Sequence, residues 1–220
     1  MSLYILPKEK LPAFVQALQA GFRVVGPVRT PTGFAFEDIT QADQLQLDYN
    51  TTILPPKKYF LPQRETLFKF HTESNSEGVQ TVDVEPVYQD VQPTVIFGIH
   101  TCDMNGIMLY DKVFSEGYRD EHYMTRRDKM VIIGIECLHP CDDASFCKDM
   151  GTLTAPPIYD LHMTDVDDDY LIDTEKTEVR TELCHPVRRE AAFVFDAPYE
   201  TSGAVYHNIV RRPDGGYNMY

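Results

Sequence analysis

Two unbroken apolar segments in the middle of the chain constrain its fold more than any other feature of the sequence. Thr94–His100 (TVIFGIH) and Met130–Ile135 (MVIIGI) contain no Asp, Glu, Lys or Arg, as is typical of strands buried on both faces of a parallel sheet. Between them, apolar side chains recur at helical spacing from Met104 to Val113. A strand, a helix and a second strand form a βαβ unit, so we expect the two strands to be parallel neighbours.

The flanking segments extend this unit into a larger domain. Residues 7–22 have the apolar pattern of an amphipathic helix, and short strands are expected on both sides of a turn at 30–33. Segments 161–164 and 170–172 favour a hairpin. The expected fold class is therefore α/β, with mixed α+β as the alternative: a central, partly parallel sheet with flanking helices and a β-hairpin. We expect residues 1–175 to form this domain and residues 176–220 to be a C-terminal extension or a partner-binding tail, in which the apolar runs at 192–195 and 206–210 favour strands.

Charge and hydropathy exclude several classes of function. The chain has 220 residues, and 20 Lys and Arg against 34 Asp and Glu give a formal net charge of −14. Such an acidic chain repels phosphate backbones, which argues against nucleic-acid binding. The longest apolar run, at 131–135, is far shorter than the roughly 20 residues that span a bilayer. Residues 1–7 lack the features of a signal peptide. We therefore expect no membrane insertion and a cytoplasmic location.

Four of the five cysteines follow the two central strands. Cys102 comes just after the first strand, Cys137 just after the second, and Cys141 and Cys147 lie in the loop beyond. Because the carboxyl ends of neighbouring parallel strands lie side by side, where α/β proteins bind ligands, we expect these thiols to converge. In a reducing compartment, four converging thiols favour a metal or iron–sulfur site over disulfides. Cys102 would also begin a helix, whose N-terminal dipole favours a thiolate or an anionic cluster.

Other interpretations of the cysteines stay open, because the spacing C-x3-C-x5-C matches no simple zinc-ribbon or ferredoxin pattern. Free buried cysteines are common in proteins. Structural zinc bound by His139 and the cysteines around it is a second alternative. A thiol enzyme that uses Cys102 is a third, although no histidine is obviously placed as its base. The fifth cysteine, Cys184, is interpreted as an ordinary surface or core thiol.

Motifs around these cysteines resemble one family of redox subunits. In order along the chain they are 55–62 (PPKKYFLP), 65–68 (ETLF), 97–103 (FGIHTCD), 111–114 (DKVF), Tyr123 with 126–128 (RRD), 133–137 (IGIEC) and 146–151 (FCKDMG). Their order and spacing are similar to those in the N-terminal domain of the iron–sulfur beta subunit of cytoplasmic sulfhydrogenases. The A subunit of anaerobic sulfite reductase shares that domain. The resemblance extends over residues 50–175.

The resemblance implies an iron–sulfur protein of an anaerobic redox complex, with a [4Fe–4S] cluster bound by Cys102, Cys137 and Cys147. In that family the subunit relays single electrons between a flavin- and NAD(P)H-binding partner and a catalytic subunit. The resemblance therefore implies an electron-transfer subunit of an oxidoreductase complex rather than an independent catalyst.

The sequence departs from the family in two respects. Where the family has Cys-Phe-Cys, this chain has Ser-Phe-Cys at 145–147, so either Cys141 or Asp103 would supply the fourth ligand. Family members also continue into a ferredoxin domain that has no counterpart after Cys147, which implies a shortened relative or a fragment. These departures motivate the alternative function: a docking or scaffold subunit with structural zinc or no metal.

The remaining patterns favour structural roles. The acidic segment 165–169 (DVDDD) lacks the glycine and the glutamate that an EF-hand requires at positions six and twelve, so we interpret it as a solvated hairpin tip. The basic pairs at 57–58 and 126–127 are expected to pair with local carboxylates. No phosphate-binding loop or hydrolase motif is present.

Overall fold

The computed structural model describes residues 2–74, 80–88, 91–174, 209–211 and 217–219. The chain divides into two compact units, Met1–Val179 and Arg180–Tyr220, and each is described by itself. The domain boundary expected between residues 175 and 176 lies outside the described residues and stays a prediction.

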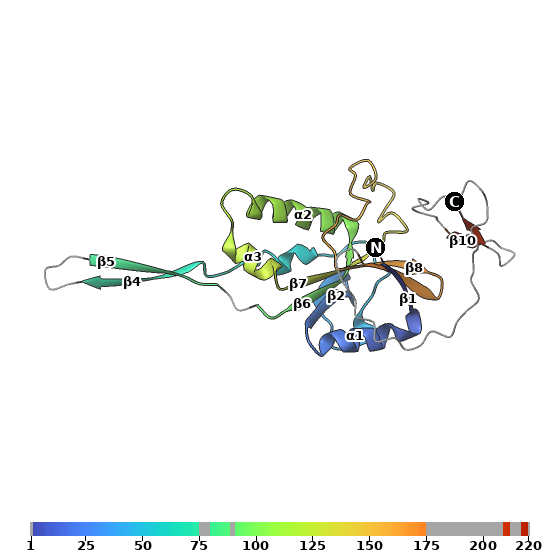
Figure 1. Cartoon of the computed structure of the whole chain (residues 1–220), viewed down its shortest axis with the longest axis horizontal. Helices are drawn as coiled ribbons and strands as arrows, with labels where there is room; N and C mark the ends of the chain where they lie inside the picture. Colours follow the sequence, from blue (N-terminus) through green and yellow to red (C-terminus); the bar gives the residue numbers. More distant parts are fainter. Residues whose placement is uncertain (1, 75–79, 89–90, 175–208, 212–216, 220) are drawn as a thin grey trace. The chain divides into compact units, whose positions relative to one another are not determined.

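A seven-stranded sheet forms the centre of the first unit (Figure 1). In spatial order its strands are β1 (Ser2–Pro7), β9 (Asp169–Thr174), β8 (Leu161–Val166), β7 (Met130–Ile135), β6 (Thr94–His100), β2 (Arg23–Thr30) and β3 (Gly33–Asp38). The central strands β8, β7, β6 and β2 are parallel. Strand β9 pairs antiparallel with β1 and β8, and β3 pairs antiparallel with β2. The sheet is thus partly parallel, which confirms the expected fold class.

Helices cover both faces of this sheet (Figure 1). The helical elements are η1 (Lys8–Lys10), α1 (Leu11–Gln19), η2 (Ala42–Gln44), η3 (Pro56–Tyr59), α2 (Thr101–Ser115) and α3 (Glu121–Arg127). Helix α1 lies on one face, and α2 and α3 lie on the other. Residues of β6 serve two cores: Val95 and Phe97 pack with the α1 side, whereas Ile96 packs with the α2 side. Because both faces are covered, every residue of β6 is buried, and this explains its continuous apolar sequence.

The strongest sequence predictions about elements are confirmed. Strands β6 and β7 coincide with the two apolar segments and pair in parallel, with α2 between them in the chain. Helix α1, the β2–β3 pair and the β8–β9 hairpin also lie where they are expected. At the tip of that hairpin, Asp167 has a φ of 51°, a conformation that Asp tolerates in turns.

Several elements were not predicted, among them three strands. Strand β1 is an edge strand whose Leu3 and Ile5 remain exposed, so its short sequence carries little burial signal. Strands β4 (Phe68–Ser74) and β5 (Gln80–Pro86) form a separate two-stranded sheet. The sequence predicted no strand there, because exposed strands lack the buried face that makes a strand recognisable.

The second unit contributes one described hairpin, in which β10 (Ile209–Arg211) pairs antiparallel with β11 (Tyr217–Met219). A strand was expected at 206–210, which overlaps β10. A further expected strand at 192–195, and Cys184, lie outside the described residues. Among the helices of the part that the structure describes, none is long and apolar enough to cross a membrane.

Candidate functional site

The candidate site lies at the carboxyl ends of β6 and β7. A β-bulge shifts the register between these strands at Phe97 and Ile99. Gly98, within the bulge, has a φ of +75°, which glycine adopts without the penalty that other residues carry. A Cβ at this position would lie 2.6 Å from Cδ2 of Leu47. The bulge lies just before the point where the chain leaves β6 and enters α2 at Thr101, directly before Cys102.

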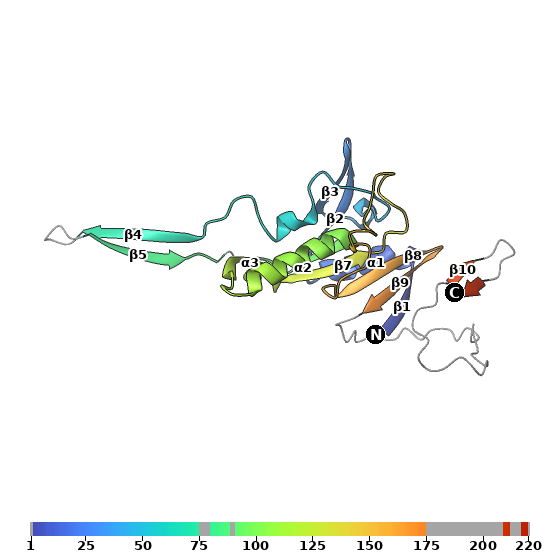
Figure 2. The ribbon, with the colours of Figure 1, turned by 90° about the horizontal axis from the view of Figure 1, so that it is seen from above.

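A second glycine lets α2 approach β7 closely. A Cβ on Gly134 would lie 2.9 Å from Cε of Met104 and 2.7 Å from Cδ2 of His162, distances that real Cβ atoms do not show. Figure 2 shows α2 lying over β7. The close packing brings the first turn of α2, which carries Cys102, beside the end of β7, where Cys137 follows.

The loop between β7 and β8 is tied to the start of α2 on one side and to the segment before η3 on the other. Nδ2 of Asn105 donates to the carbonyl oxygens of Thr152 and Thr154, at 3.4 and 3.0 Å. The Cys141 thiol donates to the carbonyl oxygen of Asn50 at 3.1 Å. Both ribbon views show this loop, coloured yellow to gold, at the N-terminal end of α2 (Figures 1 and 2).

The four cysteines expected to converge are free thiols, and they lie close enough for the charge of one to act on another. Cys102 is exposed, and Cys137, Cys141 and Cys147 are partly exposed. Desolvation of the sulfur atom is the main cause that raises the pKa of Cys102, Cys137 and Cys141, and the pKa of Cys102 reaches about 11 although other atoms of that residue are exposed. Charge on neighbouring thiols raises these pKa values further: Cys137 and Cys147 act on Cys102, and Cys147 acts on Cys141.

The raised pKa of Cys102 corrects one expectation. We expected the N-terminus of α2 to stabilise a thiolate there, and Cys102 is indeed the second residue of that helix. Desolvation of the thiol and the negative charge of Asp103 raise its pKa instead. Without bound metal, Cys102 is protonated at neutral pH, which argues against its use as an activated nucleophile.

The four thiols are the right kind of ligand for a metal ion or an iron–sulfur cluster, although they do not surround one point. Four thiols are the ligands that iron–sulfur clusters and structural zinc take from proteins. Within the described ranges, however, no three His, Cys, Asp or Glu side chains are close enough together to hold a metal ion. His139, the additional zinc ligand considered from the sequence, is exposed in the loop.

Asp103, the alternative fourth ligand, already has a partner. Nζ of Lys57 lies 2.6 Å from its Oδ1, and both side chains are mostly buried. The Lys57 side chain passes close to Gly106 of α2 on its way to Asp103. A Cβ on Gly106 would lie 3.2 Å from Nζ of Lys57. This ion pair agrees with the expectation that the basic residues pair locally, and so do the pairs of Arg126 with Glu65 and of Arg127 with Asp111.

An aromatic pair that sequence reasoning missed lies behind the cysteines. The rings of Tyr49 and His100 stack with their centroids 4.0 Å apart and their planes 6° apart. The Tyr49 hydroxyl donates to the carbonyl oxygen of Gly98 at 2.8 Å. Burial raises the pKa of Tyr49 and lowers that of His100, so both are neutral at pH 7. Tyr49 lies in a segment without periodicity, so no local sequence pattern pointed to this contact.

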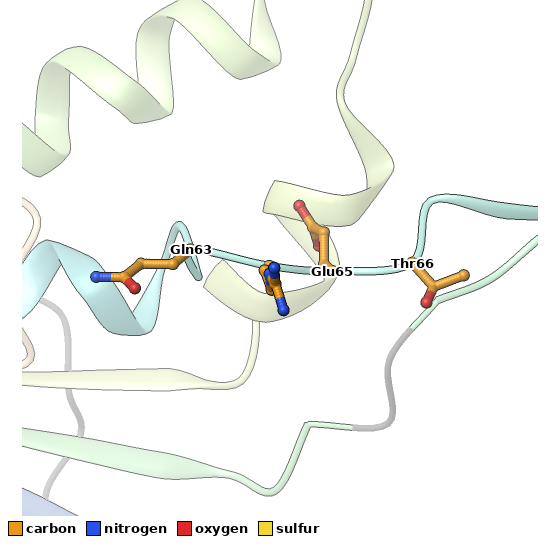
Figure 3. A pocket seen from close by; sticks show the side chains of 4 residues that line it. Gln63, Glu65 and Thr66 are labelled. Carbon is orange, nitrogen blue, oxygen red and sulfur yellow. The ribbon is translucent and has the colours of Figure 1, made fainter.

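An open pocket elsewhere in the first unit contains none of these residues. It is lined by Gln63, Arg64, Glu65 and Thr66, in the segment between η3 and β4 (Figure 3). Glu65 accepts hydrogen bonds from Arg126, so its carboxylate is already engaged. The pocket gives no reason to move the candidate site away from the cysteines.

The comparisons with known proteins agree with the motifs. No protein-family profile and no solved structure matches the chain. The chain is 36% identical over 167 residues to sulfhydrogenase 2 subunit beta of Pyrococcus furiosus. The match covers 76% of this chain and 46% of the relative, so the chain spans less than half of the relative's length. Over the matched part, the chain is therefore similar to a sulfhydrogenase beta subunit, as the motifs indicate.

Proposed function

We propose that this relative of a sulfhydrogenase beta subunit binds one [4Fe–4S] cluster and passes single electrons between two partners in a redox complex. The observation that carries the proposal is the proximity of Cys102, Cys137, Cys141 and Cys147 at the carboxyl ends of β6 and β7. A bound cluster of this kind accepts and releases one electron at a time. The residues of the chain hold it, adjust its surroundings and present it to partners.

Binding requires the loop that carries Cys137, Cys141 and Cys147 to close toward Cys102, because the thiols do not yet surround one point. Most residues from 138 to 151 are exposed, so few buried contacts oppose such a movement. The Cys141 thiol gives up only its hydrogen bond to Asn50. The first turn of α2 stays fixed by the burial of Thr101 and Met104, and it serves as the rigid side of the site.

The structure favours Cys141 over Asp103 as the fourth ligand. Asp103 is held by Lys57 across α2, and its release would leave a mostly buried ammonium group without its partner. Cys141 is partly exposed on the moving side of the site. The Lys57 charge stays close to the cluster in this arrangement, where a positive charge offsets the negative charge of four thiolates.

The partners we propose are a flavin- and NAD(P)H-binding subunit as one electron donor or acceptor and a catalytic redox subunit as the other. The relative is named as one subunit of a sulfhydrogenase, and an electron relay has no use without proteins on both sides. A reducing compartment such as the cytoplasm suits four free thiols.

The second candidate function is a docking subunit that has kept the fold without the cluster. The observation that favours it is the lack of a gathered ligand group among the described residues, together with Ser145 at a position where the family has cysteine. In that case the same thiols hold structural zinc or no metal.

One set of preparations distinguishes these functions. The chain is purified without oxygen, and iron, acid-labile sulfide and zinc are measured for the natural sequence and for four variants. The redox proposal predicts iron and sulfide near four per chain, and loss of most iron in Cys102→Ser and Cys141→Ser. Cys184→Ser is the matched control for loss of a thiol, and Asp103→Asn tests the competing ligand; both are expected to keep their iron.

Each contrary result has a specific meaning. Full iron retention in Cys102→Ser would refute the ligand assignment. Iron loss in Asp103→Asn with retention in Cys141→Ser would make Asp103 the fourth ligand. Stoichiometric zinc without sulfide, or no metal, would support the docking subunit.

A further inference from the structure

The loop that carries the cysteines also carries exposed apolar side chains. Leu138, Phe146, Met150 and Leu153 have exposed fractions of 53%, 63%, 65% and 38%; we call these four residues the loop patch. Single exposed apolar residues are common on protein surfaces, but several on one short loop are typical of a binding surface. The loop patch is therefore a candidate binding surface.

Phe146 and Met150 form the centre of the loop patch. The amides of Asp149 and Met150 donate to the carbonyl oxygen of Phe146, at 3.0 and 3.2 Å, so one turn brings residues 146 and 150 to the same side of the loop. The turn continues to Thr152, whose amide donates to the carbonyl oxygen of Cys147 at 3.0 Å. The apolar centre is thus built into the segment that contains a candidate cluster ligand.

The charges around the loop patch are mostly negative. Residues 137–153 contain the exposed carboxylates of Asp142, Asp143 and Asp149 against one cation, Lys148. Asp142 accepts hydrogen bonds from Ala144 and Ser145 within the loop. In the part of the chain that the structure describes, none of the three carboxylates forms an ion pair with a Lys or Arg side chain. An apolar centre with a polar, charged rim is the usual anatomy of a transient protein interface.

We propose that the loop patch is the docking surface for a one-electron redox protein whose cofactor edge is surrounded by Lys and Arg side chains. This inference rests on the proposed function, because an electron relay must bring its cluster close to that of its partner, and the loop patch surrounds a cluster ligand. A basic rim on the partner complements the three carboxylates. The acidic chain, with its net charge of −14, would attract such a partner over a long range.

The same charges argue against a second copy of the chain as the occupant. A symmetric contact through the loop patch would bring two sets of Asp142, Asp143 and Asp149 together, and like charges across an interface oppose association. Electron-transfer encounters bury little surface, which suits a patch of four side chains.

The test measures binding rather than electron transfer, so that it does not depend on a bound cluster. The probe is zinc-substituted cytochrome c, a redox-inert protein with a ring of lysines around its porphyrin edge. Succinylated zinc cytochrome c, in which the lysines carry negative charge, is the matched control. Binding to the whole chain is followed by titration calorimetry at low and at physiological ionic strength. We expect the natural chain to bind the first probe, more weakly as salt rises, and not to bind the second.

Uncharged substitutions separate the loop patch from general attraction between acidic and basic proteins. Phe146→Ser and Met150→Ser, singly and combined, leave the net charge unchanged, and the double variant is expected to weaken binding about tenfold. Leu109→Ser and Val113→Ser are the controls, because these residues of α2 are equally exposed, at 58% and 66%, and lie outside the loop. They are expected to bind like the natural chain.

Three results would overturn the proposal. Equal binding by the double variant and the natural chain would exclude the loop patch. Protection of Phe146 and Met150 from hydroxyl-radical labelling in the free chain would mean that another part of the chain covers them. A dimer that Phe146→Ser dissociates would make a second copy the occupant. Iron and sulfide, measured on the same preparations, report separately on the proposed function.

Discussion

At Arg126 the fold buries a positive charge together with its partners. The residue is 4% exposed, its Nε donates to the carbonyl oxygen of Phe60 at 2.8 Å, and its other nitrogens donate to the carboxylate of Glu65. These contacts fasten the segment after η3 to α3. A buried ion pair of this kind is costly to break from one side, because the remaining charge loses its partner in a poorly solvated place.

We therefore expect Arg126→Met to lower the free energy of unfolding by about 3–5 kcal/mol. The matched control is Arg119→Met, which removes a similar ion pair with Glu121 in which both side chains are about half exposed. There the loss should stay within about 1 kcal/mol. Urea denaturation of both variants checks the prediction, and equal losses would show that burial does not make the Arg126 pair more costly to break.

His162 makes the stability of the protein depend on pH. It is buried in β8, its Nε2 has no hydrogen-bond partner, and the nearest acidic atom is Oε2 of Glu136 at 3.6 Å. Burial lowers the pKa of His162, although the charge of Asp173 opposes this effect. The folded state therefore binds a proton at His162 less readily than the unfolded state does.

The sign of the effect follows from that difference. As the pH falls through the ordinary histidine pKa of about 6.5, the unfolded state takes up protons first, so the free energy of unfolding decreases. Glu136 acts in the opposite direction, because burial raises its pKa. The difference between the natural chain and His162→Gln isolates the histidine. The natural chain should lose more stability than His162→Gln between about pH 7.5 and pH 5.5. An equal loss of stability in the natural chain and in His162→Gln over this pH range would contradict the role given to His162.

Among the elements of the first unit, the β4–β5 hairpin is expected to contribute least to the stability of the fold. Residues 68–73 and 81–86 are exposed throughout, and in the described part of the chain these strands form a sheet of their own. Its base is already closed, since the amide of Val87 donates to the carbonyl oxygen of Leu67 at 2.9 Å.

Replacement of residues 68–86 by Asn-Gly should therefore change the melting temperature by no more than about 4 °C, which corresponds to about 1 kcal/mol. Phe60→Ala is the contrasting variant, because Phe60 is fully buried, and it should cost about 3–5 kcal/mol. Thermal unfolding followed by circular dichroism measures both. A fall of more than 10 °C in the shortened chain would mean that the hairpin packs against other parts of the protein.

At the scale of the whole molecule, the sequence predicted the buried strands, and it missed strands whose residues are largely exposed. β6 and β7 were recognisable because both of their faces are covered, and this requires apolar residues at every position. The topology that follows from them was enough to expect Cys102 and Cys137 near each other. The exposed strands β4 and β5 carry no such requirement, and the edge strand β1 has only Tyr4 and Leu6 packed against the core.

The details of the candidate site depend on contacts between distant segments, which a local pattern does not contain. The ion pair of Lys57 with Asp103 and the stacking of Tyr49 on His100 join residues about 50 positions apart. The stabilised thiolate expected at Cys102 was wrong for a similar reason, because charges on Cys137 and Cys147, far along the chain, contribute to the raised pKa of its thiol. The domain boundary at 175 and the cluster itself stay predictions.

The central claim is that the chain binds a cluster that carries one electron. The most direct test is a redox titration of the anaerobically prepared chain, followed by electron paramagnetic resonance. We expect a reversible one-electron transition, with a signal from a reduced iron–sulfur cluster that appears on reduction, disappears on reoxidation and is absent from Cys102→Ser. A protein that contains its full complement of metal but gives no iron–sulfur signal at any potential would contradict the account.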